Sequence, residues 1–227
     1  MGEIIEYASN GSTARGYLAT SDPVGPGVIV IQEYWGLVDQ ITRTCDRFAA
    51  EGFTALAPDL FHGTTVPLTE PEDAAKEMMA MSMDVTAKDL SGTVDELTRR
   101  SGRERVGVIG FCMGGGLALV LATQRPDAVA AVVTAYGLIP WPGATPDFSK
   151  LNAPVQGHFG RNDDFFSPEA AGQLEVTLNH AGTDTTFHIY EGVGHAFFNE
   201  DRPEVYNAKA AALLWDRALA FFRQTLS

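Results

Sequence analysis

The sequence has little of what disulfide-rich, nucleic-acid-binding and membrane proteins require. It contains two cysteines, Cys45 and Cys112, among 227 residues, which are too few for a disulfide framework. Lys and Arg number 16 against 29 Asp and Glu, and the resulting net charge of −13 repels phosphate backbones and anionic lipid. The longest apolar stretches, 28–31 and 128–133, are too short to cross a bilayer. We therefore expect no nucleic-acid partner and no membrane partner.

The N-terminus also lacks a basic segment followed by an apolar one. We therefore expect no signal peptide and a cytoplasmic, reducing location. Hydrophobic residues make up 45% and charged residues 20% of the chain, a balance typical of globular proteins. No repeat, linker or low-complexity tract divides the sequence, which predicts a single domain over residues 1–227. No pattern in the sequence predicts an oligomeric state.

The order of apolar patterns predicts an α/β fold with a mostly parallel central sheet flanked by helices. An N-terminal antiparallel hairpin is indicated by Asn10-Gly11, which lies between two alternating runs. Apolar bursts typical of buried strands follow at 27–31, 53–57, 106–111, 128–135, 155–159 and 187–190. Helical periodicity alternates with them at 40–50, 74–100 (expected to be broken), 114–123, 168–181 and 208–222. Sheets of this kind bind ligands beyond the carboxyl ends of their strands.

A glycine-rich turn around Cys112 is the sharpest motif. Gly110-Phe111-Cys112-Met113-Gly114 follows a predicted strand and opens a helix, as in the G-x-nucleophile-x-G elbow with cysteine in place of serine. The helix N-terminus favours the thiolate of Cys112, and the N–H of Met113 is placed to stabilise an oxyanion. The alternative is a strand-to-helix turn with a structural cysteine. A phosphate-binding loop is disfavoured because Lys and G-x-G-x-x-G are missing.

A cysteine nucleophile needs a base, and His195 is the favoured one of five histidines. It follows the last predicted strand and precedes the final helix, which matches the chain order nucleophile, acid, histidine. His188 falls inside a predicted strand and is expected to be a packed or edge residue. Core or solvated roles are expected for the remaining three, His62, His158 and His180.

The acid that orients this base is expected just after the strand at 155–159. Asp163 is preferred there and Asp164 is the fallback, because periodicity does not separate them. The loop after 27–31 reads Gln32-Glu33-Tyr34-Trp35-Gly36 and is expected to supply a second oxyanion donor. The residues alone support two interpretations of Glu33 about equally: a charge on the surface, or a buried carboxylate near the thiol.

Taken together, these motifs resemble the dienelactone hydrolase (carboxymethylenebutenolidase) family of the α/β-hydrolase fold. The resemblance covers nearly the whole chain and combines the Q-E-x-x-G loop, a cysteine elbow and the stretch Gly194-His195-Ala196-Phe197. It implies that Cys112, Asp163 and His195 form a catalytic triad and that Glu33 is the partner of the thiol. It also implies that the N–H of Tyr34 joins that of Met113 in the oxyanion hole.

Two departures from the family concern the substrate. Family enzymes specialised for dienelactone hold its carboxylate with arginines, but no basic residue follows His195 before Arg202, and residues 64–89 contain only lysines. A neutral amide does not replace a bidentate arginine. Trp35, Phe197 and Phe198 are instead expected to line a more apolar substrate pocket. The methionines of 78–83 are interpreted first as helix packing.

The sequence thus favours a cysteine-dependent hydrolase of small esters or lactones. The chemistry needs no cofactor, and no metal site is predicted because no Cys/His cluster has ligand spacing. One alternative is a thioesterase or acyl transferase on the same triad, and another is an inactive binding protein that keeps the fold. A glutamine amidotransferase is disfavoured because Phe197 stands where an acid is expected.

Overall fold

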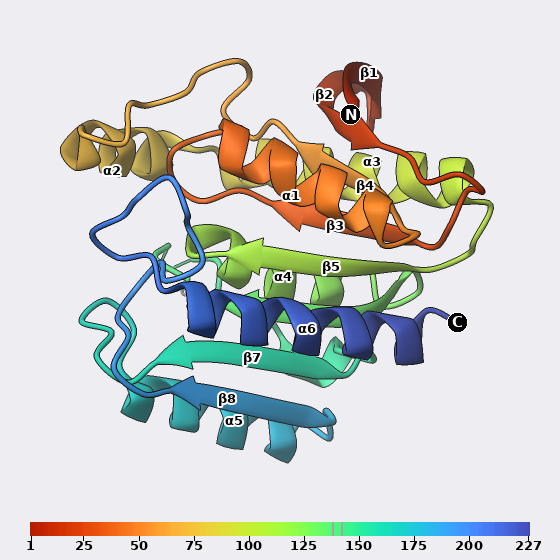
Figure 1. Cartoon of the computed structure of the whole chain (residues 1–227). Helices are drawn as coiled ribbons and strands as arrows, with labels where there is room; N and C mark the ends of the chain where they lie inside the picture. Colours follow the sequence, from red (N-terminus) through yellow and green to blue (C-terminus); the bar gives the residue numbers. More distant parts are fainter. Residues whose placement is uncertain (138, 142) are drawn as a thin grey trace.

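The computed structural model describes residues 1–137, 139–141 and 143–227 and shows an eight-stranded sheet covered by helices on both faces (Figure 1). The strand order is β1-β2-β4-β3-β5-β6-β7-β8. β1 and β2 pair antiparallel, as do β2 and β4, whereas all later neighbours are parallel. The predicted α/β fold, with its antiparallel hairpin at the N-terminus, is confirmed.

The strands follow the apolar bursts closely. They are β1 (Glu3–Ser9), β2 (Ser12–Ala19), β3 (Gly27–Ile31), β4 (Thr54–Pro58), β5 (Val106–Phe111), β6 (Val129–Ala135), β7 (Val155–Gly160) and β8 (Thr185–Tyr190). Every residue of β3 to β7 is buried, because helices cover both faces of these strands. Edge strand β8 is half-buried over most of its length, with Thr186 exposed and Tyr190 buried.

The helices also lie where periodicity predicts them. They are α1 (Asp39–Ala50), α2 (Pro71–Ala80), α3 (Met83–Ser101), α4 (Met113–Gln124), α5 (Pro168–His180) and α6 (Ala208–Thr225), with a short 3-10 helix at Phe148–Lys150. The expected break in 74–100 falls at Met81-Ser82, where the Ser82 side chain caps the start of α3. The helix core around α1 includes Cys45, which is fully buried as a structural thiol.

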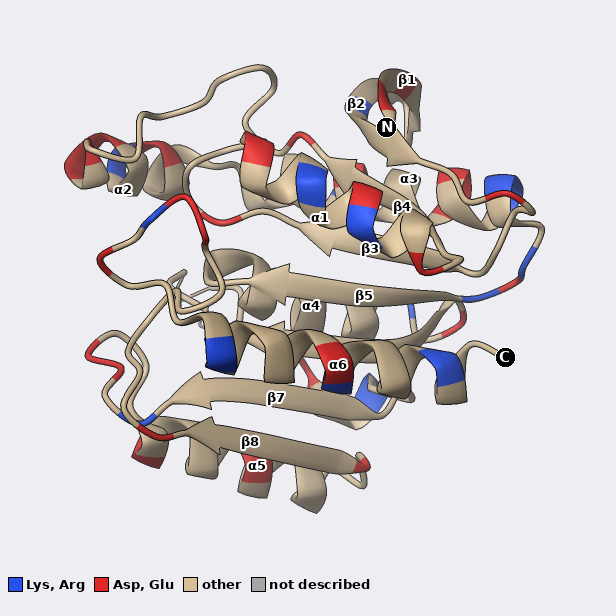
Figure 2. Cartoon of the chain, viewed as in Figure 1, with Lys and Arg blue, Asp and Glu red and all other residues tan. Residues whose placement is uncertain are grey.

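Two layers of apolar side chains hold the helices to the sheet. α1 and α6 pack on one face, around Phe48, Trp215 and Phe222, and lie in front of the sheet in Figure 1. α3, α4 and α5 cover the other face through residues such as Leu90, Leu117 and Leu178. Charged residues gather on helices and loops, while β5, β7 and β8 carry none (Figure 2). No helix among the described residues is long and apolar enough to cross a membrane.

A buried histidine lies on β7, away from the ends of the strands. His158 Nδ1 is 2.8 Å from the Tyr190 hydroxyl, and Nε2 is 2.9 Å from Gln156 Oε1. Because Gln156 Oε1 can only accept, Nε2 carries the proton and Nδ1 accepts from Tyr190. Burial lowers the pKa of His158 well below 6.5, and the charges of His188 and Arg217 add to this. His158 is therefore a neutral core residue, within the expectation of a core or solvated role.

This histidine is expected to make the protein sensitive to acid. Unfolding exposes His158 to water, where it binds a proton below about pH 6.5, while the folded protein keeps it neutral. The free energy of unfolding should therefore fall by about 1.4 kcal/mol per pH unit below that point on account of this one group. Urea denaturation between pH 7 and 5 should show that the free energy of unfolding falls less steeply with decreasing pH in His158→Gln than in wild type. The matched variant at exposed His180, His180→Gln, should behave as wild type, and equal slopes in all three proteins would contradict the assignment.

Candidate active site

The turn between β5 and α4 lifts Cys112 above the end of the sheet. Its φ of 54° and ψ of −121° are strained for a residue with a side chain. A Cβ at Gly110 would lie 1.9 Å from the Gly114 carbonyl oxygen, and one at Gly114 would lie 2.5 Å from the carbonyl oxygens of Ile31 and Gln32. Glycine is therefore required at both positions. The close approach at Gly114 also holds the loop after β3 against the first turn of α4.

His195 meets Asp163 across two neighbouring loops. The loop before His195 packs on Gly160 at the end of β7, where a Cβ would be 2.5 Å from the Val193 carbonyl oxygen. His195 Nδ1 lies 2.9 Å from Asp163 Oδ2. Asp163 is buried, whereas Asp164 is exposed. The two carboxylates that the sequence left open thus have different surroundings, and Asp163 is the one that contacts the histidine.

The electrostatics of this cluster favour a charged imidazole. Burial lowers the pKa of His195, but its interactions with Asp163 and Cys112 outweigh burial and raise the pKa to about 10. The second Asp163 oxygen, Oδ1, accepts hydrogen bonds from the N–H groups of Phe165 and Phe166, at 2.8 and 2.9 Å. Both carboxylate oxygens are therefore satisfied, and the imidazole is held in one orientation. A protonated imidazole in this position is suited to stabilise a thiolate.

Glu33 is buried beside this cluster and is bound by two neutral donors. The Tyr136 hydroxyl donates to Oε1 at 3.0 Å, and the Asn199 side chain donates to Oε2 at 2.8 Å. Burial raises the pKa of the Glu33 carboxyl, against the lowering effect of the bond from Asn199 and the charge of His195. Of the two readings that the residues left open, the structure shows the buried one.

Two backbone N–H groups at the site have no acceptor among the described residues. Met113 is the first residue of α4, where N–H groups have no partner within the helix. Tyr34 follows Glu33 in the loop after β3. Neither N–H donates to an acceptor in the part of the chain that the structure describes. Both are therefore free to bind an oxygen atom of a ligand.

Comparisons with known proteins identify the family of this chain. The family model described as "Dienelactone hydrolase family" matches residues 14–226, which is nearly the whole chain. The chain belongs to the dienelactone hydrolase family. "Protein usf" of Aquifex pyrophilus is 38% identical over 236 residues, covering all of both chains. "Putative carboxymethylenebutenolidase" of Aquifex aeolicus is 34% identical over 239 residues, again covering both completely.

A solved structure supports the same family. The crystal structure titled "Putative Dienelactone Hydrolase", from Klebsiella pneumoniae, is 27% identical to this chain. It superposes with a TM-score of 0.85 and covers 99% of each chain. Membership of the dienelactone hydrolase family establishes an α/β-hydrolase fold and a hydrolase relationship.

The three aromatic residues expected in the substrate pocket are all buried in the structure. Trp35 is almost fully buried among Val66 and Ala74, with the Arg202 guanidinium 5.4 Å from its ring. Phe197 is fully buried, and Phe198 stacks on Phe111 in the core. Contact of these side chains with a substrate remains a prediction.

Three residues that the sequence did not single out lie at the site. Tyr136 directly follows β6, has a positive φ of 40° and packs its ring 5.1 Å from the His195 ring. Its position at a strand end, where ligand sites gather, was the signal that could have found it. Asn199 lies four residues after His195, and Phe165 lies two residues after Asp163. Nothing in the sequence alone marks these two.

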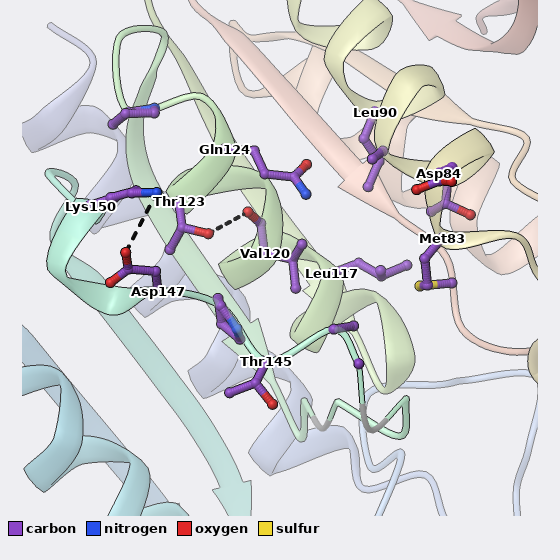
Figure 3. A pocket seen from close by; sticks show the side chains of 16 residues that line it. Met83, Asp84, Leu90, Leu117, Val120, Thr123, Gln124, Thr145, Asp147 and Lys150 are labelled. Carbon is purple, nitrogen blue, oxygen red and sulfur yellow. Dashed lines mark hydrogen bonds and ion pairs between the residues drawn. The ribbon is translucent and has the colours of Figure 1, made fainter.

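A separate cavity of about 580 Å³ lies between α3, α4 and residues 143–150 (Figure 3). Met83, Leu90, Leu117 and Val120 form part of its wall, and an Asp147–Lys150 ion pair lies at one side. None of the residues that line it is one of the predicted site residues. No group of three His, Cys, Asp or Glu side chains within residues 1–137, 139–141 and 143–227 is arranged to hold a metal.

Proposed function

We propose that the protein is a cysteine-dependent hydrolase of small, uncharged esters or lactones. The observation that carries the proposal is the cluster of Cys112, His195 and Asp163 beyond the carboxyl ends of β5, β8 and β7. Nothing in folding requires a strained cysteine, a charged imidazole and a buried carboxylate to meet at three separate strand ends. Together they supply a nucleophile, a proton carrier and a group that orients it.

In the first half of the proposed reaction, the thiolate of Cys112 attacks the carbonyl carbon of the substrate. The carbonyl electrons move to its oxygen, and the N–H groups of Tyr34 and Met113 stabilise that negative charge. When the tetrahedral intermediate collapses, the bond to the alkoxy oxygen breaks and His195 gives that oxygen its proton. An alcohol is released, or remains attached if the substrate is a lactone, and a thioester remains on Cys112.

The second half hydrolyses this thioester. Once sulfur is acylated, it no longer carries the charge that helps to raise the pKa of His195, so the neutral imidazole is favoured. His195 then takes a proton from water as the hydroxide attacks the thioester, while Asp163 holds the ring by its Nδ1–H. Collapse releases a carboxylic acid and returns the thiolate and the imidazolium.

Glu33 is proposed as the partner of the thiol. A negative charge next to Cys112 opposes the thiolate, and a protonated carboxyl does not. Because burial raises the pKa of Glu33, the site can keep this group neutral while the thiolate forms. Tyr136 and Asn199, which bind its two oxygens, are positioning residues in this proposal.

The preference for uncharged substrates follows from the charges around the site. Arg202 is the arginine whose charge acts on Glu33 and Tyr136, and its Nε is 2.9 Å from Glu204 Oε1. Its guanidinium also lies over Trp35. A carboxylate on the substrate would therefore compete with Glu204 for Arg202 in a protein of net charge −13.

The test compares dienelactone, which carries a carboxylate, with its methyl ester, which has the same lactone ring without that charge. We expect the kcat/KM of lactone opening to be at least about tenfold higher for the methyl ester. A substrate carboxylate that lacks a charge-assisted hydrogen bond in the site loses about 1.5–3 kcal/mol of binding free energy, and the methyl ester does not pay this cost. Ring opening is followed by ultraviolet absorbance. Preference for dienelactone itself would contradict the uncharged substrate class. If the protein opens neither lactone ring and also does not hydrolyse phenyl acetate, the hydrolase proposal is overturned.

A further inference from the structure

An exposed aromatic ring lies directly beside the histidine of the site. Phe165 is 73% exposed, and its ring centroid is 5.0 Å from that of His195. A phenylalanine exposed to this extent leaves a large apolar surface in contact with water. By contrast, Trp35, Phe197 and Phe198 are all buried. Phe165 is therefore the phenylalanine at this site that a ligand can reach.

The backbone fixes the position of this ring relative to the imidazole. The N–H of Phe165 donates to Asp163 Oδ1 at 2.8 Å, and the other oxygen of the same carboxylate binds His195. The next residue, Phe166, donates to Asp163 Oδ1 and stacks on Phe159 in β7. The backbone of Phe165 and the imidazole of His195 are thus held by the same carboxylate, that of Asp163, which fixes the positions of the two residues relative to each other.

We infer that the Phe165 ring binds the alcohol-side group of the substrate and gives the site a preference for flat, apolar alcohol groups. The inference rests on the proposed function. His195 has to lie within hydrogen-bond distance of the departing alkoxy oxygen in order to protonate it. The carbon attached to that oxygen then lies near the imidazole. Two rings pack beside the imidazole, those of Tyr136 and Phe165. Tyr136 is fully buried, so the exposed ring of Phe165 is the one placed to contact the alcohol-side group.

The charges next to this ring limit what binds there. Asp164 is its exposed neighbour in sequence, and Arg161, on the same loop, pairs with Glu191 at 3.0 Å. An anionic alcohol group would meet the exposed carboxylate of Asp164, whereas an uncharged ring would gain an aromatic contact. The substrate class is therefore an ester whose alcohol part is uncharged and aromatic, such as a benzyl ester.

The experiment compares three esters with the wild type, Phe165→Ala and Phe165→Leu. Benzyl acetate carries its ring on the alcohol side, ethyl phenylacetate carries it on the acyl side, and ethyl acetate has none. We expect Phe165→Ala to lower kcat/KM for benzyl acetate by roughly 3–10-fold, mainly through KM, because an aromatic contact contributes on that scale. The other two esters should change less than twofold, and Phe165→Leu should lie between.

Val176→Ala serves as the matched control, because Val176 is an exposed apolar residue on α5 and should leave all three esters unchanged. An equal loss for the three esters in Phe165→Ala, or a loss confined to ethyl phenylacetate, would overturn the inference. Each variant should unfold at the urea concentration of the wild type to within a few tenths molar, because the changed side chains are exposed.

A second measurement does not depend on ester hydrolysis. Iodoacetamide and N-benzyl iodoacetamide both alkylate a thiolate, which displaces iodide and forms a thioether, and mass spectrometry locates the product at Cys112. The benzyl reagent should be favoured roughly 3–10-fold more in wild type than in Phe165→Ala. If wild type shows this preference for the benzyl reagent but hydrolyses none of the esters, the proposed function is rejected and the aromatic contact of Phe165 is supported. Equal ratios in the two proteins would reject the contact, whatever the hydrolysis data.

Discussion

Cys112→Ala is expected to lower ester turnover by at least about 10⁴-fold, because no other group at the site can form the thioester. The variant should fold, since alanine fits the space of the thiol and keeps the glycines of the turn. Turnover of phenyl acetate and intact-mass detection of the acyl-enzyme provide the measurement. Wild type should gain the mass of one acetyl group during turnover, and the variant should gain none.

Cys45→Ala is the matched control for this experiment. Cys45 is fully buried in α1, and burial raises the pKa of its thiol, so it is expected to be unreactive. Its replacement should leave kcat and the acetyl adduct unchanged, apart from a modest loss of stability. If acetylation persists in Cys112→Ala and disappears in Cys45→Ala, Cys45 is the nucleophile and the proposed role of Cys112 is wrong.

Asp163→Asn should have the second largest effect, a loss of about 10⁴-fold in kcat, on the scale known for histidines left in the wrong tautomer. The asparagine oxygen can still accept the N–H bonds of Phe165 and Phe166, so the loop should keep its shape. Its amide nitrogen, however, would face His195 Nδ1 and would no longer stabilise the imidazolium. The pKa of His195, which the carboxylate now helps to raise to about 10, should therefore fall, and NMR titration of the imidazole would show this.

Asp164→Asn separates the two adjacent carboxylates. Asp164 is exposed, and the histidine contact is made by Asp163. The Asp164 variant should therefore keep its turnover within about twofold and leave the titration of His195 unchanged, as expected of a surface change. A loss in Asp164→Asn as large as that in Asp163→Asn would contradict the proposed orienting role of Asp163.

The fold was largely predictable because each of its elements has a strong local signal. The Asn10-Gly11 turn fixed the hairpin, and the apolar bursts marked strands to within one or two residues. β8 was expected at 187–190 but begins at Thr185, because an edge strand is only half covered and lacks a full apolar run. Periodicity predicts a break within 74–100 but does not place it at Met81-Ser82.

The site was predictable where chain order carries information and less so where packing decides. Cys112 and His195 follow strand ends in the expected order, and the structure adds the contact between Asp163 and His195 that periodicity could not supply. The orientation of aromatic side chains was not accessible in this way. Phe165 and Phe198 are equally apolar in sequence, yet one is exposed beside the imidazole and the other stacks in the core.

The tight packing around the first turn of α4 has a consequence for how this protein can diversify. Gly110, Gly114, Gly115 and Gly137 each lie so close to neighbouring backbone or side-chain atoms that an added Cβ would approach within 2.6 Å. Substitutions there disturb the scaffold before they alter selectivity. Changes in substrate range are therefore expected in segments that tolerate new side chains, and the stretch around the exposed Phe165 is one of them. Directed evolution for new esters should therefore randomise that stretch and leave the glycines around Cys112 unchanged.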